Sequence, residues 1–271
     1  MNSLEALLPW LLYLFTGVFA GFLAGLLGIG GGMIIVPALI LSFHWQGLTP
    51  EVSTHLAVGT SLASIVLTAT SSIRTHHQKG GVDWSVLQRF VPALMVGALL
   101  GAQIAHQLPA RVLQLVIGVF ALWTGWQMLK AQKPDVIQQP LPTGAPLFAA
   151  GGVIGVASAI FGIGGGSLMV PYLCHHGVRI QRAVGTAAAA GFPIALAGSA
   201  GFIISGWGLN SLPSGATGYV YWPALLGIAL TSLIFAHFGA STAHKLPAAK
   251  LKRAFGVVLV LVGIRFVIGV G

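Results

Sequence analysis

Residues 28–37 read Gly-Ile-Gly-Gly-Gly-Met-Ile-Ile-Val-Pro, and residues 162–171 read Gly-Ile-Gly-Gly-Gly-Ser-Leu-Met-Val-Pro. Seven of the ten positions are identical, and the two copies begin 134 positions apart, at residues 28 and 162. Each copy lies inside a long apolar stretch. Glycine runs interrupt helices because glycine costs backbone entropy there, and paired breaks in the two halves of a chain point to a transporter's binding site. The repeat therefore indicates a duplicated membrane unit with a break in each copy.

The composition places the chain in a lipid bilayer. Of 271 residues, 13 are Lys or Arg, 4 are Asp or Glu, and 56% are hydrophobic, whereas a soluble domain needs far more surface charge. A helix that crosses the bilayer needs about 20 apolar residues, and a porin-like barrel would show alternating ~10-residue strands instead. We predict an all-α polytopic membrane protein. The stretches without Asp, Glu, Lys or Arg that support it are 6–50, 52–73, 90–110, 136–178 and 183–244.

The similarity between the halves extends beyond the glycine motif. The matching segments are Ala-Val-Gly-Thr at 57–60 and 183–186, Pro-Ala-Leu at 92–94 and 223–225, His-x-Leu-Pro-Ala at 106–110 and 244–248, and the glycine pairs Gly118 and Gly125 with Gly256 and Gly263. Residues 131–143 are polar and proline-rich, as a linker would be. We expect an N-terminal membrane repeat at 1–130, a cytoplasmic linker at 131–143 and a C-terminal membrane repeat at 144–271.

The distribution of Lys and Arg favours one way for each glycine motif to enter the membrane, because cytoplasmic loops carry an excess of these residues. If each motif turns back as a helical hairpin, 11 of the 13 basic residues lie on one side, and Arg111 and Arg265 remain on the other. If both motifs cross fully, the split is about 7 to 6. The hairpin arrangement gives each half an odd number of crossings. The two halves are then inverted relative to each other, which is a common transporter design.

The expected architecture is two inverted-topology repeats, each a Gly-broken helical hairpin plus three transmembrane helices. The hairpins cover about 9–43 and 144–173, and both termini lie outside. Thr49 and Asp83 are the expected N-caps of the helices that follow them. The six expected crossings are 52–73, 86–106, 111–130, 183–205, 219–240 and 250–269.

The glycine tips are the main candidate binding site. A helix that restarts after such a break exposes free N–H groups and the positive end of its dipole, and both suit an anion. The alternative is close helix packing, since small residues crowd the interfaces between membrane helices. The candidate residues are Gly30, Gly31 and Gly32 in the first tip and Gly164, Gly165 and Gly166 in the second.

Hydroxyl side chains beside matching glycines are further candidates. Thr60, Ser61 and Thr186 could donate hydrogen bonds to a solute in the same cavity, although such residues often bond to their own backbone. Each threonine follows a glycine of the Ala-Val-Gly-Thr segment, Gly59 or Gly185, which we take as part of the structural motif.

What the sequence lacks also limits the mechanism. The four acids, Glu5, Glu51, Asp83 and Asp135, fall in loops or at helix ends, so no buried carboxylate serves a coupling ion. An anion that moves outward gains about 2.3 kcal/mol per charge per 100 mV, which favours export driven by the membrane potential. His55 keeps proton coupling open and could also bind the anion, or it could only bond to a neighbouring helix.

Other functional classes find little support. No paired catalytic carboxylates and no His-rich metal cluster stand out, so we expect no enzyme, no metal site and no cofactor. The net charge of +9 falls in loops and helix ends and suits topology and lipid contact rather than nucleic acid. The single Cys174 excludes an internal disulfide. The expected partners are the lipid bilayer and a small anionic solute, and the oligomeric state stays open, a homo-oligomer included.

The doubled glycine motif and the segment Ala-Val-Gly-Thr-Ser at 57–61 resemble the TauE/SafE-type family of sulfite and organosulfonate exporters, over about residues 12–268. The resemblance implies a bacterial-type inner-membrane permease, multi-pass and with both termini periplasmic or extracellular in our topology. It also implies a small sulfur-containing anion as the solute, such as sulfite, sulfoacetate or a related sulfonate.

The resemblance carries over to individual positions where the motifs match. These are the two glycine tips with Pro37 and Pro171, together with Gly59, Thr60 and Ser61. The second half departs at Ala187, where the counterpart of Ser61 lacks a hydroxyl.

We therefore expect a secondary transporter that exports a small sulfur-containing anion by alternating access. The alternatives are a channel or carrier for another small solute, and a membrane assembly factor without transport activity.

Overall fold

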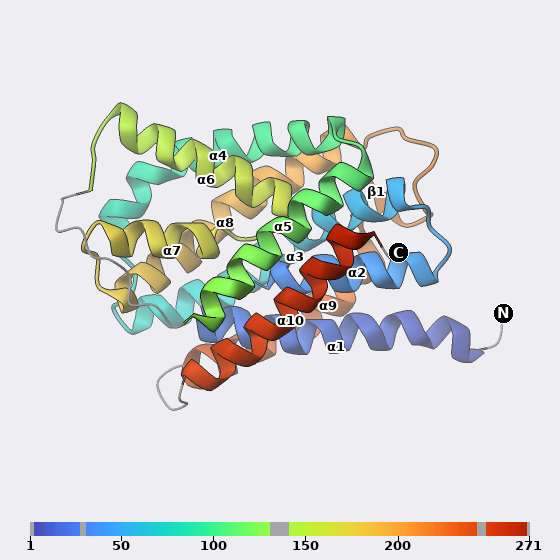
Figure 1. Ribbon diagram of the computed structural model, residues 1–271, viewed down its shortest axis with the longest axis horizontal. Helices are drawn as coiled ribbons and strands as arrows, with labels where there is room; N and C mark the ends of the chain where they lie inside the picture. Colours follow the sequence, from blue (N-terminus) through green and yellow to red (C-terminus); the bar gives the residue numbers. More distant parts are fainter. Residues whose placement is uncertain (1–2, 28–30, 131–140, 243–247, 270–271) are drawn as a thin grey trace.

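The computed structural model describes residues 3–27, 31–130, 141–242 and 248–269, which form ten helices and one short β-hairpin (Figure 1). The hairpin strands are β1 (Ala216–Thr217) and β2 (Val220–Tyr221), antiparallel, with Ala216 opposite Tyr221. The helices are α1 (Ser3–Leu27), α2 (Gly32–Trp45), α3 (Pro50–Gln78), α4 (Trp84–Gln107), α5 (Ala110–Leu129), α6 (Ala145–Phe161), α7 (Gly166–His175), α8 (Ile180–Ser205), α9 (Trp222–Thr242) and α10 (Ala248–Ile268).

Six helices in the described parts of the chain are long and apolar enough to cross a membrane. They are α1, α3, α4, α5, α8 and α9. The apolar part of α10 that qualifies is shorter, Gly256–Ile268. The prediction of an all-α polytopic membrane protein is confirmed.

Helices α3 and α8 form the centre of the molecule. Of their apolar windows, 72% and 61% of the residues are buried, compared with 33–44% in the other four membrane-crossing helices. The outer helices instead turn large apolar side chains outward, among them Phe15, Leu230 and Leu261, each more than 60% exposed. In a bilayer these side chains contact lipid, so the polar groups of α3 and α8 are shielded by a ring of apolar helices.

Equivalent elements of the two halves pack in equivalent ways. Helix α1 lies along α9 as α6 lies along α4, while α5 packs on α10 and α3 on α8. At the α5–α10 contact, a Cβ at Gly263 would lie 2.8 Å from the Gly118 oxygen, and a Cβ at Gly125 would lie 2.8 Å from the Gly256 oxygen. Corresponding residues thus exchange partners, as they do around a two-fold axis.

Helices α1 and α6 run in opposite directions, as do α5 and α10 (Figure 1); the inverted repeat itself stays a prediction. The repeat boundaries at 1–130 and 144–271 stay a prediction. Most of the linker, residues 131–140, lies outside the described residues.

Both glycine motifs turn the chain back on itself. In the first half, Gln46 Nε2 after α2 donates a hydrogen bond of 2.8 Å to the Tyr13 hydroxyl in the first half of α1. In the second half, Phe90 lies beside both arms: a Cβ at Gly151 of α6 would lie 3.2 Å from its ring, and its ring centroid is 5.9 Å from that of Tyr172 on α7. Each motif is therefore a hairpin whose two arms end on the same side of the molecule.

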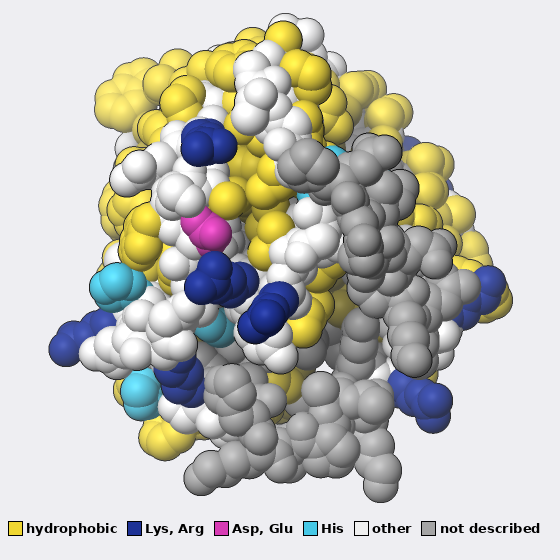
Figure 2. Space-filling view, turned by 90° about the vertical axis from the view of Figure 1, so that its left-hand side faces the viewer, with side chains coloured by type: hydrophobic (Ala, Val, Ile, Leu, Met, Phe, Trp, Pro, Cys, Tyr) yellow, Lys and Arg dark blue, Asp and Glu magenta, His cyan; other side chains and the backbone are white. Residues whose placement is uncertain are grey.

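The two ends of the molecule differ in charge. One end, which we call the basic face, gathers the end of α3 with the start of α4 and the end of α7 with the start of α8, and Lys and Arg side chains are spread across it (Figure 2). The opposite end, the termini face, holds the ends of α2 and α10 and the β-hairpin (Figure 1). Besides Arg111 and Arg265, the described basic residues belong to segments at the basic face: Arg74, Lys79, Arg89, Lys130, Arg179, Arg182, Lys250, Lys252 and Arg253.

Three local predictions need correction. The crossing predicted at 219–240 starts later, at Trp222, because Gly218 takes a φ of +52° and turns residues 216–221 into the β-hairpin. The first hairpin begins before residue 9, at Ser3, since Leu, Glu and Ala at the N-terminus favour helix. Asp83 caps α4 as predicted, whereas Thr49 precedes α3 without a side-chain cap hydrogen bond.

Candidate functional site

The two glycine tips meet inside the molecule. A Cβ at Gly32 would collide with the carbonyl oxygen of Gly162 and would lie 2.9 Å from the Ile163 Cα. Ser167 Oγ lies 3.8 Å from Met33 Sδ, and these two residues occupy the same position of the repeated motif. Equivalent positions of the two motif copies therefore lie in contact at the tips.

The backbone of the second tip requires glycine. Gly162, the C-cap of α6, has a φ of +66°, and Gly165, the N-cap of α7, has a φ of +76°. Side chains with a Cβ rarely adopt this left-handed region. Gly166 is the first residue of α7 and is buried. At the first tip Gly31 is the N-cap of α2, with a φ of −70°, and the predicted Gly30 lies outside the described residues.

Helices α2 and α7 both start at buried positions without a side-chain cap. The first N–H groups of a helix have no partner within the helix, and they form a favourable environment for an anion. The two tips thus bring two helix N-termini together, one from each half of the chain.

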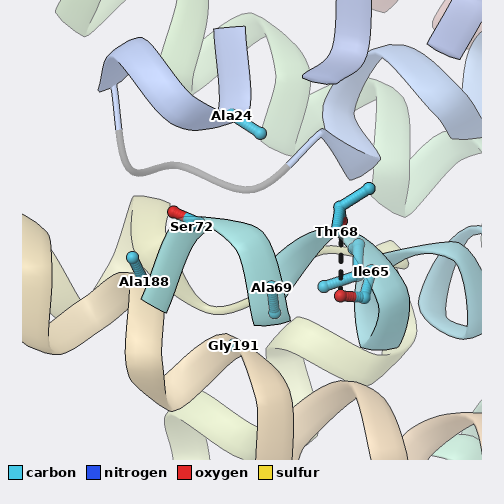
Figure 3. Close-up of a pocket in the computed structure, with 8 residues that line it drawn as sticks. Ala24, Ile65, Thr68, Ala69, Ser72, Ala188 and Gly191 are labelled. Atoms are coloured by element: carbon cyan, nitrogen blue, oxygen red, sulfur yellow. Dashed lines mark hydrogen bonds between the residues drawn. The ribbon is translucent and has the colours of Figure 1, made fainter. Parts of the chain in front are cut away.

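A small cavity adjoins the second tip (Figure 3). Residues of α1, α3 and α8 face one another across it, and its volume is about 20 Å³. A cavity needs about 10–15 Å³ to hold one water molecule, so the space admits water and excludes a sulfur oxyanion. The lining residues are Ala24, Ile65, Thr68, Ala69, Ser72, Gly164, Ala188 and Gly191.

Ser72 gives this cavity its one polar group without a partner among the described residues. Its side chain is 6% exposed and its Oγ makes no hydrogen bond. Thr68, one turn earlier on α3, donates its hydroxyl to the Ile65 oxygen at 3.3 Å. A buried hydroxyl without a partner costs about 1–3 kcal/mol, and a solute or water in the cavity would remove that cost.

Of the predicted hydroxyl residues, Ser61 lies directly at the tips. It is fully buried, and its Oγ donates a hydrogen bond of 2.8 Å to the Gly162 oxygen. Helix α3 of the first half is thereby fixed to the glycine tip of the second half. Pro37 and Pro171 lie inside α2 and α7, on the returning arms of the two hairpins.

Thr60 lies at a contact between the halves near the termini face, which we call the aromatic junction. Its Oγ1 accepts a hydrogen bond of 2.9 Å from the Tyr221 N–H. A Cβ at the preceding Gly59 would collide with the Tyr219 oxygen. The junction holds helix α3 against the β-hairpin of the other half.

Thr186 lies at the equivalent contact near the basic face, which we call the polar junction. Its Oγ1 accepts a hydrogen bond of 2.9 Å from the Asp83 N–H. A Cβ at the preceding Gly185 would collide with the Gly81 oxygen. The roles of Thr60 and Thr186 as solute ligands stay predictions, and the structure places each at one of these two junctions rather than at the tips.

His55 lies beside the aromatic junction and is 5% exposed. Its Nδ1 is 2.9 Å from the Glu51 oxygen and its Nε2 is 2.9 Å from the Ala105 oxygen. Both neighbours are hydrogen-bond acceptors. A neutral imidazole has one N–H and satisfies one of them, whereas a protonated ring satisfies both. The ring also packs on Tyr219, with centroids 5.3 Å apart.

Sequence reasoning missed a row of hydroxyl residues along α3. Thr54, Ser61, Thr68 and Thr75 recur every seven residues and are all buried, and Ser72 lies on the same side, one turn after Thr68. Seven residues make about two helical turns, so these side chains share one face. The period was visible in the sequence, and we call this row the hydroxyl stripe.

The described residues contain no group of three His, Cys, Asp or Glu side chains that could hold a metal ion.

Comparison with known proteins places this sequence among membrane transporters. The family described as sulfite exporter TauE/SafE matches residues 13–266. A probable membrane transporter protein of Haemophilus influenzae is 35% identical over 254 residues, which cover 94% of this chain and 96% of that protein. The probable membrane transporter protein YunE of Bacillus subtilis is 26% identical over 270 residues, covering 93% and 94%.

No solved structure matches the chain. The family match spans nearly the whole sequence, including both glycine motifs and both junctions. The chain belongs to the TauE/SafE sulfite exporter family of membrane transporters.

Proposed function

We propose that this protein is a secondary transporter that exports a small sulfur-containing anion, such as sulfite or a sulfonate, by alternating access. The observation that carries the proposal is the contact between the two glycine tips beside a buried cavity with an unpartnered hydroxyl. Helix N-termini and small residues let an oxyanion approach the backbone closely. The family's printed description names sulfite, which supports this class of solute.

The size of the cavity supports a mechanism in which the tips separate. With about 20 Å³ beside Gly164, an oxyanion enters only when the second tip moves away from α3 and α8. Because the tips come from opposite halves, such a movement changes the relation between the halves. That is the motion that alternating access between two repeats requires.

The hydroxyl stripe supports a route for the solute. Thr54 and Thr75 lie 21 positions apart on α3, or about 31 Å at 1.5 Å per residue, which is close to the hydrocarbon thickness of about 30 Å. It passes the tips at Ser61 and the cavity at Thr68. Most of these hydroxyls donate to backbone oxygens in this conformation, so their use along the route requires a change of rotamer.

The charge of the two faces supports the direction. By the positive-inside rule, the basic face is cytoplasmic, and both termini then lie on the periplasmic side of a bacterial inner membrane. An anion that leaves through the termini face moves down the membrane potential, which contributes about 2.3 kcal/mol per charge per 100 mV. We assign the protein no catalytic reaction.

The test is flux of labelled sulfite and sulfoacetate into and out of proteoliposomes under an imposed potential. We expect saturable flux that rises when the potential drives anions across. Flux of a neutral solute in its place would favour a different carrier, and a correctly folded protein that moves neither anion would disprove the proposed substrate class.

The cavity is tested by Ser72→Ala, with Ser64→Ala as the matched control. Both serines are buried on α3, but Ser64 donates to the Thr60 oxygen at 2.8 Å and does not line the cavity, whereas Ser72 lines it without a partner. We expect Ser72→Ala to raise the KM for sulfite about tenfold, since loss of one hydrogen bond to a charged ligand costs about 1.5 kcal/mol. Equal KM values in the two variants would remove Ser72 from the site.

A further inference from the structure

Arg111 and Arg265 are 154 positions apart in the sequence but line one cavity at the termini face. Its volume is about 270 Å³, more than ten times that of the cavity at the tips. The ends of α2 and α10 and the starts of α3 and α5 enclose it. It is therefore large enough for a small oxyanion together with water.

Arg111 is held in a fixed position at this cavity. Its Nη1 donates to the Phe266 oxygen and its Nη2 to the Val267 oxygen, each at 2.8 Å. These bonds cap the C-terminal end of α10, where a positive charge is favourable. A guanidinium has five N–H donors, so two are used by the cap and three remain for other partners.

The capping of α10 explains why Arg111 lies at this cavity, but it does not explain the other polar residues that line it. Arg265 lines the same space, with Gln114, Ser53 and His44 as further polar residues. Glu51 adds one negative charge, so among the described lining residues two arginines and one glutamate give a formal surplus of one positive charge. A concave surface with surplus positive charge raises the local concentration of anions.

The cavity also adjoins the hydroxyl stripe. Gln114 Nε2 donates a hydrogen bond of 2.8 Å to Thr54 Oγ1, and Thr54 is the first residue of that stripe. A solute in the cavity would thus lie next to the end of the proposed route.

We propose that this cavity, the arginine vestibule, is a binding site for small oxyanions at the termini-face mouth of the transporter, distinct from the site at the tips. Arg265 and the donors of Arg111 that α10 does not use recognise the oxyanion, because guanidinium groups match the planar pairs of oxygens in such ions. The proposal rests on the proposed function in that the anion bound there is one that the transporter releases.

The test measures the charge preference of the vestibule without measuring transport. The full-length protein carries one cysteine, the buried Cys174, so Cys174→Ser gives a background without thiols. Leu41→Cys then places a single thiol on an apolar, partly buried residue of the vestibule wall. The rates of labelling by an anionic and a cationic methanethiosulfonate reagent are compared, with and without methanesulfonate as the oxyanion probe.

We expect the anionic reagent to react faster than the cationic one, and methanesulfonate to slow both. Arg265→Gln should slow the anionic reagent and speed the cationic one, each about fivefold, since one unit charge at 4 Å in water contributes about 1 kcal/mol with opposite sign for the two. Their rate ratio should therefore fall about 25-fold. The matched control is Arg253→Gln, the same change on the same helix but at its basic-face end. It should leave the ratio unchanged.

Either of two results would contradict an oxyanion site in the vestibule. One is an anionic-to-cationic labelling ratio that Arg265→Gln leaves unchanged, and the other is no protection of the thiol by methanesulfonate. Elution of each variant as a single species on size exclusion separates these results from misfolding. The labelling test also stands apart from the flux assay. If the protein moves no sulfite but still labels faster with the anionic reagent, the proposed substrate is wrong and the vestibule stands. If it moves sulfite but labels without charge preference, the vestibule proposal is wrong.

Discussion

The aromatic junction and the polar junction share a backbone geometry and differ in their surroundings. In each, a glycine lies under a carbonyl oxygen and the next threonine accepts an N–H two residues further along, at 2.9 Å in both cases. At the aromatic junction Tyr219 and Val220 of the partner segment are buried and Tyr221 is partly exposed. Tyr219, 7% exposed, packs between His55 and Phe202.

At the polar junction the partner segment borders solvent. Gly81 and Asp83 are partly exposed, and Lys79 and Gly80 before them are exposed. Water can therefore replace a lost hydrogen bond at the polar junction more easily than at the aromatic one. The same contact is therefore shielded from water at the aromatic junction and accessible to water at the polar junction. We expect the polar junction to open first.

The largest effect on the free energy of unfolding is expected from replacing the glycine of each junction, Gly59 or Gly185, by alanine. Gly59→Ala places its Cβ against the Tyr219 backbone and 3.1 Å from the Phe202 Cβ, where nothing can move away without disturbing the core. We expect a loss of about 1–3 kcal/mol, measured as a lower midpoint of thermal unfolding in detergent by tryptophan fluorescence. Gly185→Ala should cost less, because the segment around Gly81 can shift toward solvent.

The control for this pair is Gly152→Ala on α6, where an added Cβ would meet nothing within 4 Å. It should be neutral or slightly stabilising, since alanine favours helix over glycine. A drop at Gly185→Ala as large as the drop at Gly59→Ala would show that the two junctions are equally rigid.

A smaller loss of stability is expected from removing the hydroxyl of Thr60 or Thr186, which accepts the junction hydrogen bond. Thr60→Val leaves the Tyr221 N–H without its partner, and an unsatisfied buried donor costs about 1–3 kcal/mol. Thr186→Val should cost about 1 kcal/mol or less, because water can reach the Asp83 N–H. Thermal unfolding of both variants, with Thr60→Ser and Thr186→Ser as controls that keep the hydroxyl, measures the difference. Equal costs would contradict a dry and a hydrated junction.

Much of the architecture was readable from the sequence because membrane constraints are strong. Uncharged stretches gave the helices, and the two glycine motifs gave the hairpins, since nothing else in a bilayer tolerates such breaks. The face that collects Lys and Arg also followed from sequence alone. The β-hairpin at 216–221 did not, because its turn depends on Gly218 and on pairing with Thr60 across the molecule.

The candidate site was predicted less completely for the same reason. The Ala-Val-Gly-Thr-Ser segment predicts Ser61 as a site residue, and its hydroxyl lies at the tips. The same pattern predicts Thr60 and Thr186, but a one-residue step along a helix turns the side chain by about 100°, and both face the junctions instead. The meeting of Arg111 and Arg265 depends on the antiparallel contact of α5 and α10, which spacing along the chain does not reveal.

The smallest loss of stability is expected at Asp83, which belongs to the polar junction. Its carboxylate accepts hydrogen bonds from Ser85 Oγ at 2.6 Å and from the Val86 N–H at 3.2 Å. Asp83→Ala removes this cap of α4 and should cost about 1 kcal/mol, whereas Asp83→Asn keeps a good capping residue and should cost less.

The same carboxylate gives a pH test with a definite sign. The hydrogen bond from Ser85, opposed in part by desolvation, holds the pKa of Asp83 below its usual value. A lowered folded-state pKa stabilises the protein above the unfolded-state pKa of about 3.9, and the contribution is lost as the pH falls through the folded-state value. The gap in unfolding midpoint between wild type and Asp83→Asn should therefore be constant from pH 8 to about pH 5 and shrink below about pH 4. A gap that closes near neutral pH instead would mean that another titrating group determines the pH dependence of stability at the polar junction.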